Sequence, residues 1–169
     1  QAAQILRQMG TPCLIHQPSY NMFDRWVENG LLDVLDEQGI GAIVFSPLAQ
    51  GQLTDRYLNG IPDGARASKT ERVWLTPAQV QANLEKIKQL NHLARQRGQK
   101  LSQMAIAWVL QHPNVSSAII GATKPSQIKE NVKASGVKLS NETLKAIDKA
   151  LDSVIERDPK KTTSPNPRA

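Results

Sequence analysis

The chain has 169 residues, of which 40% are apolar, with 21 Lys and Arg against 15 Asp and Glu. This length suits one domain, and folding could bury about two-thirds of the surface of the unfolded chain. No run of about 18 apolar residues occurs, which excludes a membrane-spanning helix. Residues 1–10 show no charged region followed by an apolar core, so we expect no secretory signal there. The single cysteine, Cys13, excludes an internal disulfide framework and cannot by itself build a cysteine metal site.

The net charge of +6 is unevenly distributed along the chain. Residues 1–65 carry 3 basic and 7 acidic groups, residues 66–139 carry 12 and 3, and residues 140–169 carry 6 and 5. The positive middle region is either a solvated helix face or a surface that meets an anion, such as a nucleic acid or a phosphate-bearing cofactor. Nucleic acid is disfavoured, because the seven aromatic residues do not lie among Lys and Arg as a base-stacking surface requires.

Three short apolar runs, each polar or small at its C-terminal end, predict strands at Cys13–Gln17, Ala42–Ser46 and Ser117–Gly121. Nearly continuous hydrophobicity over this length is typical of strands buried on both faces of a parallel sheet. The outer strands of a three-stranded sheet leave rows of unpaired N–H and C=O groups. We therefore expect these strands to be part of a larger sheet, and we expect the chain to associate with itself through the exposed sheet edges.

Helical patterns lie between and after the strands, in the alternation that a parallel sheet with right-handed crossovers requires. One pattern runs from Gly30 to Gln38. The segment Thr76-Pro77-Ala78-Gln79 is a helix start signal, and the helix it begins ends at Gly98. Three further helices are predicted: one capped by Ser102 and ending at Leu110, one from Pro125 to about Ala134, and one capped by Ser140 with Leu144, Ile147, Leu151 and Val154 on one face.

Two stretches lack a regular pattern. The long stretch from Ala49 to Leu75 predicts a functional loop, because loops of this length more often have a function than not. The residues after Glu156 are rich in Pro and Thr and predict a flexible C-terminal tail at 157–169.

Polar residues follow each predicted strand, where parallel α/β proteins bind ligands. After the third strand, Thr123 and Lys124 precede a helix that starts at Pro125, which predicts an anion site or, alternatively, an ordinary capped turn. Gln17 and Ser46 offer uncharged hydrogen-bonding groups, and Phe45 is either a stacking residue or a core residue. His16 has no partner at a telling spacing and is interpreted as structural, and no metal-ligand spacing occurs.

Three segments resemble a known family: HQPSYN, FSPLAQGQLTDRYLNGIPDGARAS and IIGATKPSQIKENV. They look like the last three strands of an aldo-keto reductase, in the branch of the bacterial L-glyceraldehyde-3-phosphate reductases and the potassium-channel β-subunits. The resemblance covers about residues 1–155. It implies an α/β fold in which residues 1–156 are the C-terminal part, about strands 6–8 with flanking helices, of a (β/α)8 TIM barrel.

The resemblance also implies a site for NADPH. Gln17 would hold the nicotinamide carboxamide and Phe45 would stack on the nicotinamide ring, whereas the loop with Arg56 and Arg66 would close over the cofactor. Thr123 matches the hydroxyl near the adenosine 2′-phosphate, and the charge of Lys124, like that of the two arginines, suits NADPH better than NADH. The remaining matches line the pyrophosphate or surround the adenosine: Ser46, Pro47, Leu48, Ala49, Gln50, Gly51, Gly121, Gln127, Glu130 and Asn131.

The resemblance implies that the parent protein is a cytoplasmic oxidoreductase, which reduces aldehydes and ketones by hydride transfer. The family's catalytic Asp, Tyr, Lys and His come from earlier strands, and no residue here matches them. We therefore expect this chain, which begins at Gln1, to be inactive alone and to be a segment of a reductase that takes small carbonyl substrates. The alternative is a non-catalytic half-barrel that acts as a nucleotide-binding or assembly module.

Overall fold

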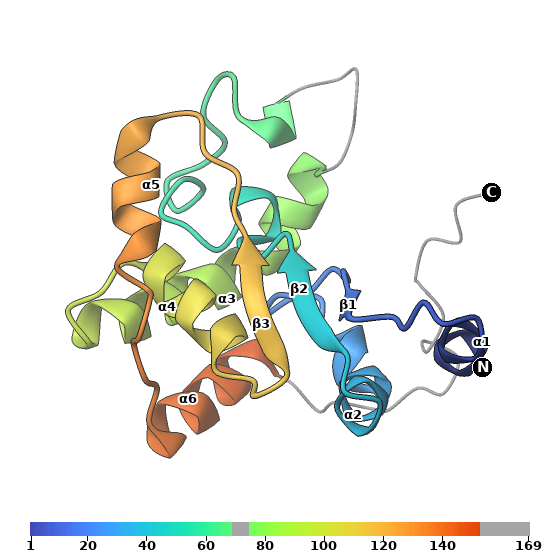
Figure 1. Cartoon of the computed structure of the whole chain (residues 1–169). Coiled ribbons are helices and arrows are strands. Elements are labelled where there is room, and N and C mark those ends of the chain that lie inside the picture. The colour runs from blue at the N-terminus through green and yellow to red at the C-terminus, as the bar shows by residue number, and fades with distance from the viewer. Residues whose placement is uncertain (69–74, 153–169) are drawn as a thin grey trace.

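The computed structural model describes residues 1–68 and 75–152. Three strands and six α-helices follow one another in these ranges (Figure 1). Short 3-10 turns occur at Trp26–Glu28, Ala49–Gly51 and Arg66–Ser68. In chain order the helices and strands are α1 (Ala2–Gln8), β1 (Ile15–His16), α2 (Leu31–Glu37), β2 (Gly41–Phe45), α3 (Pro77–Gln96), α4 (Leu101–Leu110), β3 (Val115–Ile119), α5 (Pro125–Val132) and α6 (Asn141–Leu151).

The strands form one parallel sheet in the order β1-β2-β3, which confirms the three parallel strands expected from the sequence. The predicted bounds need correction, because β1 has only two residues and β3 begins and ends two residues earlier than expected. The register of β2 against β3 shifts between Ala42 and Ile43, so that Ser116 bulges. Gly41 makes room for this bulge, since a Cβ there would lie 2.6 Å from Ser116 Oγ.

The expectation that the sheet is buried on both faces is wrong. Ala42 and Val44 are fully buried against the helices, which lie behind the sheet in Figure 1. The alternate residues of the sheet face the other side, and the exposed fractions there are 51% for Ile15, 41% for Phe45 and 42% for Ile119. Because the apolar runs are continuous, hydrophobicity alone does not show that one face of the sheet is partly exposed among the described residues.

The helices begin largely where their start signals predict. Thr76 Oγ1 accepts a hydrogen bond from the Gln79 N–H at 3.1 Å, and Gln79 Oε1 accepts from the Thr76 N–H at 2.8 Å, which completes a capping box for α3. Ser140 caps α6 through the Thr143 N–H. The prediction that Ser102 caps α4 is wrong: Lys100, two residues earlier, is the N-cap residue, and Ser102 is buried inside the first turn of the helix.

The hydrophobic core lies between the sheet and the layer of α3, α4 and α6. Every residue of α4 from Leu101 to Val109 is buried, as expected for a helix that other elements cover on all sides. Ile87 and Leu90 of α3 and Ile147 of α6 are fully buried in the same cluster. The predicted tail at 157–169 and the predicted core residue Val154 lie outside the described residues.

Candidate functional site

A cavity of about 820 Å³ opens at the carboxyl ends of β2 and β3. Three segments build most of it: the turn after β2, the loop that follows as far as Arg66, and the connection from β3 into α5. Lys100 and Ser102 at the start of α4 complete the lining. The three segments lie above the arrowheads of the strands in Figure 1, with α5 beside them. The volume is in the range of small-molecule and cofactor sites, which is about 300–1,000 Å³.

Most of the residues predicted from the sequence to bind a cofactor meet at this cavity. The exceptions are Gln17, Ala49 and Lys124: Gln17 is exposed beyond the edge strand β1, Ala49 is buried behind the turn, and Lys124 is exposed outside the cavity. The predicted residues that line the cavity are Phe45, Ser46, Pro47, Leu48, Gln50, Gly51, Arg56, Arg66, Gly121, Thr123, Gln127, Glu130 and Asn131.

The turn after β2 has an unusual backbone. Ser46, Ala49 and Gln50 have φ angles of +58°, +47° and +61°, in the left-handed region, and Gly51 has +93°. The left-handed conformation costs a residue other than glycine about 1–2 kcal/mol. Strain of this kind persists only where surrounding contacts hold it, and it concentrates at functional sites. The turn, most of whose residues line the cavity, is therefore held in one shape by the contacts around it.

Side chains from two segments meet across one wall of the cavity. Arg66 Nη1 donates a hydrogen bond to Gln50 Oε1, and Gln50 Nε2 donates to Ser46 Oγ at 3.4 Å. Gln50 thereby connects the loop that carries Arg66 to the end of β2. Thr54 supports the intervening chain, since its hydroxyl donates to the Gly51 carbonyl at 2.7 Å and accepts from the Arg56 N–H at 3.1 Å.

The start of α5 is closed by one of its own side chains. Gln127 Oε1 accepts hydrogen bonds from the N–H groups of Thr123 and Lys124 at 2.7 and 3.2 Å, and from the Thr123 hydroxyl at 3.3 Å. Lys124 is the N-cap residue of α5, as the alternative interpretation of this segment held. Thr123 nevertheless lines the cavity, so the ordinary turn and the candidate anion site occupy the same residues.

Glu130 lies in a polar cluster that the sequence did not reveal. Its carboxylate lies 3.2 Å from Lys100 Nζ and accepts a hydrogen bond from Gln103 Nε2. Lys100 precedes α4, more than 20 residues before Glu130, and it lines the cavity together with Ser102. Folding of α4 against α5 brings these residues together, and no local spacing signals that contact. Among the described residues, three basic side chains line the cavity: Arg56, Arg66 and Lys100.

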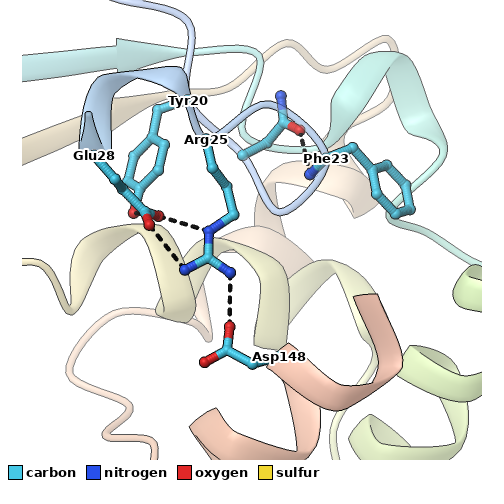
Figure 2. A network of polar contacts seen from close by, with 6 residues as sticks. Tyr20, Phe23, Arg25, Glu28 and Asp148 are labelled. Carbon is cyan, nitrogen blue, oxygen red and sulfur yellow. Dashed lines mark hydrogen bonds and ion pairs between the residues drawn. The ribbon is translucent and has the colours of Figure 1, made fainter. Parts of the chain in front are cut away.

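A second polar group, away from this cavity, ties the segment after β1 to α6. Figure 2 shows Arg25 between Glu28 and Asp148: its guanidinium donates to both Glu28 oxygens at 2.8 Å and to Asp148 Oδ1 at 2.6 Å. The Tyr20 hydroxyl donates to Glu28 Oε1 at 2.7 Å. Burial, and after it the Glu28 carboxylate, raise the pKa of Tyr20, so that the phenol stays protonated. Arg25 also lies 5.0 Å from the ring centre of Trp108.

Arg25 thus pairs with both carboxylates of this network, which thereby joins the segment after β1 to α6. Within residues 1–68 and 75–152, no group of His, Cys, Asp and Glu is arranged to hold a metal ion. None of the helices in those ranges is long and apolar enough to cross a membrane.

Comparison with known proteins identifies the family. The model of the Aldo/keto reductase family matches residues 1–152, and the chain belongs to that family. It is 46% identical over 153 residues to an L-glyceraldehyde 3-phosphate reductase of Escherichia coli (strain K12), covering 88% of this chain and 44% of that protein. This match confirms the reductase branch expected from the motifs, and two plant proteins confirm the potassium-channel β-subunit branch.

These two proteins are each named "Probable voltage-gated potassium channel subunit beta". The one from Oryza sativa subsp. japonica is 40% identical over 154 residues, and the one from Arabidopsis thaliana is 41% identical over 154 residues. Each alignment covers 89% of this chain and 46% of the plant protein. The chain thus spans about half the length of the curated relatives it matches.

Proposed function

We propose that the cavity at the ends of β2 and β3 binds NADPH and that the chain is the cofactor-binding segment of a carbonyl reductase. The observation that carries the proposal is the meeting of three separate segments at one cavity, with an aromatic ring at the end of β2 and a hydroxyl at the start of α5. Members of the family generally use a nicotinamide dinucleotide. In the parent protein this segment would correspond to about strands 6–8 of a (β/α)8 barrel.

The residues present suit the parts of such a cofactor. Phe45, which is 41% exposed at the cavity, offers an apolar face to a planar ring. The strained turn after it offers peptide groups, and Arg56 and Arg66 offer positive charge to a pyrophosphate. Thr123 offers a hydroxyl to a 2′-phosphate near the N-terminus of α5. When bound, NADPH would supply a hydride, whereas this chain's residues bind and orient it.

The substrate follows from the same proposal. The E. coli relative is named as a reductase of L-glyceraldehyde 3-phosphate, which is a small aldehyde that carries a phosphate. We propose a small aldehyde or ketone as the substrate class of the parent reductase. The family's catalytic Asp, Tyr, Lys and His have no match in this sequence, so the 169-residue chain is expected to bind the cofactor without turnover.

The second candidate is a non-catalytic module that assembles with a further chain. The exposed sheet face favours it, because Ile15 of β1 and Ile119 of β3 are 51% and 42% exposed there. Leu14, just before β1, is also 69% exposed. Both candidates predict that the chain associates with itself, and analytical sedimentation measures whether it does. A stable, well-folded monomer at high protein concentration would remove the assembly candidate.

Titration of the chain with NADPH and NADH tests the proposal. Replacing both Thr123 and Lys124 by Ala is expected to weaken NADPH more than NADH, because only NADPH carries the 2′-phosphate. The single variants divide the effect: Thr123 lines the cavity and Lys124 does not, so Thr123→Ala should carry most of it. Lys129→Ala, on the exposed side of α5, is the matched control and should change neither affinity. Equal losses for both nucleotides would contradict the assignment.

A further inference from the structure

Two buried amide side chains contact the strained turn from behind. Asn21, which follows β1, is 4% exposed, and Gln52, which follows the turn, is 7% exposed. Neither was singled out in the sequence, and neither lines the cavity. Burying an amide is costly unless its hydrogen bonds are made, so the partners of these two side chains indicate what they do.

Asn21 holds the first left-handed residue. Its Nδ2 donates a hydrogen bond to the Ser46 carbonyl at 3.0 Å, and its Oδ1 accepts from the Phe23 N–H at 2.9 Å, which fixes the amide orientation. The backbone around it is tied to the same strand end, because the Tyr20 N–H donates to the Phe45 carbonyl at 3.2 Å. The peptide that carries φ of +58° at Ser46 is therefore held by a group on a different segment.

Gln52 holds the second left-handed residue in a similar way. Its Nε2 donates to the Ala49 carbonyl at 3.3 Å, and its Oε1 accepts from Asn83 Nδ2 at 2.9 Å. Asn83 belongs to α3, so this contact anchors the turn to the helical layer. Ala49 and Gln50 both have left-handed φ angles, and the Ala49 carbonyl also accepts the Gln52 N–H at 3.1 Å.

We infer that Asn21 and the Gln52–Asn83 pair are positioning residues, which hold the turn after β2 in the shape in which it would meet a dinucleotide pyrophosphate. The left-handed residues of that turn are Ser46, Ala49 and Gln50. The identity of the ligand in this inference rests on the proposed function, but the hydrogen bonds that fix the turn are present whichever ligand binds. The two amides act on the carbonyls of Ser46 and Ala49, so the shape of the cavity wall is set before a ligand arrives. Their contribution falls on the pyrophosphate and leaves the adenosine end, which α5 builds, unaffected.

The test compares two nucleotides on the same variants. Asn21→Asp and Gln52→Glu keep the side-chain shape and replace the donating NH₂ by an oxygen. Each should raise the Kd for NADPH about tenfold, as loss of one buried hydrogen bond implies. The Kd for adenosine 2′-monophosphate, which lacks the pyrophosphate, should stay unchanged. A merely structural role would weaken both nucleotides together, and that result would overturn the inference.

Asn114→Asp is the matched control. Asn114 Nδ2 donates to the Leu32 carbonyl at 3.2 Å, the same kind of long-range amide bond, but just before β3 begins, at the other end of that strand from the cavity. This variant should leave the Kd of NADPH as it is. Rescue gives a further arm: Ala49→Gly, added to Gln52→Glu, should recover part of the lost affinity, because glycine adopts a left-handed φ without a hold.

Hydrogen exchange without any nucleotide separates the inference from the proposed function. Asn21→Asp should speed amide exchange over residues 46–53 at least severalfold, more than Asn114→Asp does. Unchanged exchange in that segment would overturn the inference even if NADPH binds. Conversely, a wild-type chain that does not bind NADPH, but shows the faster exchange in Asn21→Asp, would contradict only the proposed function.

Discussion

Replacement of Arg25 by Met should destabilise the fold strongly, because one guanidinium joins two distant parts of the chain. Arg25 makes two hydrogen bonds to Glu28 at 2.8 Å and one to Asp148 of α6 at 2.6 Å, and its side chain is only 16% exposed. Methionine retains the length of the side chain and can still pack on Trp108. It removes the charge and all three hydrogen bonds, and it leaves Glu28 facing the Tyr20 hydroxyl alone.

The magnitude follows from the burial of each partner. Breaking a buried charge pair costs about 3–5 kcal/mol, because the remaining charge stays desolvated. Glu28 is 16% exposed and keeps its hydrogen bond from Tyr20, so its share falls below that range, at about 1.5–2 kcal/mol. Asp148 is 45% exposed and regains water, so its share is close to zero, as for a surface pair. The lost contact of the cation with Trp108 adds about 0.5–1 kcal/mol. The expected loss of unfolding free energy is about 2–3 kcal/mol after these discounts.

Urea denaturation followed by circular dichroism measures this loss. With a slope of about 2 kcal/mol per molar urea, the midpoint should fall by about 1–1.5 M. Asp148→Asn should lower it by less than half as much, because its carboxylate is largely hydrated. Arg25→Lys, which keeps the charge but not the two-pronged contact, should lie between. A midpoint for Arg25→Met within about 0.2 M of the wild-type value would refute the assigned role.

Three further predictions concern other sites. Burial raises the pKa of Asp24 although Ser19 donates a hydrogen bond to it, so its stabilising contribution is present below the unfolded pKa of about 3.9 and is lost as pH rises through the higher folded value. Asp24→Asn should therefore gain stability relative to wild type as pH rises from about 3 to 7, and an equal difference at both pH values would contradict this. Lys100→Met should weaken NADPH about two- to fivefold, because it leaves the Glu130 carboxylate at the cavity without its cation, and unaltered affinity in a titration would argue against that contact. Thr76→Ala should cost about 1 kcal/mol in thermal or urea unfolding through loss of the cap of α3, unlike a substitution at exposed Gln81.

Local signals in the sequence predicted the elements well. The capping box at Thr76 and the cap at Ser140 each rest on residues within four positions of one another, so their geometry is encoded locally. The parallel order of the three strands also followed, because alternation of strands and helices leaves few topologies open. The cap of α4 was assigned wrongly to Ser102, because a serine in the first turn of a helix and a serine at its N-cap give nearly the same sequence pattern.

The long-range contacts could not be predicted in this way. Arg25 meets Asp148 across 123 positions, and Asn83 meets Gln52 across 31. Such pairs depend on how the helices pack on the sheet, and the identity of a single residue does not indicate that packing. The left-handed φ angles at Ser46, Ala49 and Gln50 could not be predicted either, because none of these residues is glycine, the residue type that usually indicates such a conformation. The position of the cavity at the strand ends, with Phe45, Ser46 and Thr123, was expected from the parallel sheet, whereas Arg56 and Arg66 were expected there only through the family resemblance.

Hydrogen exchange of the 169-residue chain with and without saturating NADPH tests the central proposal most directly. If the cavity at the ends of β2 and β3 binds the dinucleotide, amides in residues 45–53 and in residues 121–131 should be protected together, since the two segments line opposite parts of one cavity. Helix α6, which contributes no residue to the cavity, should show little change. Protection of neither segment, or protection confined to a region away from both, would contradict the proposal.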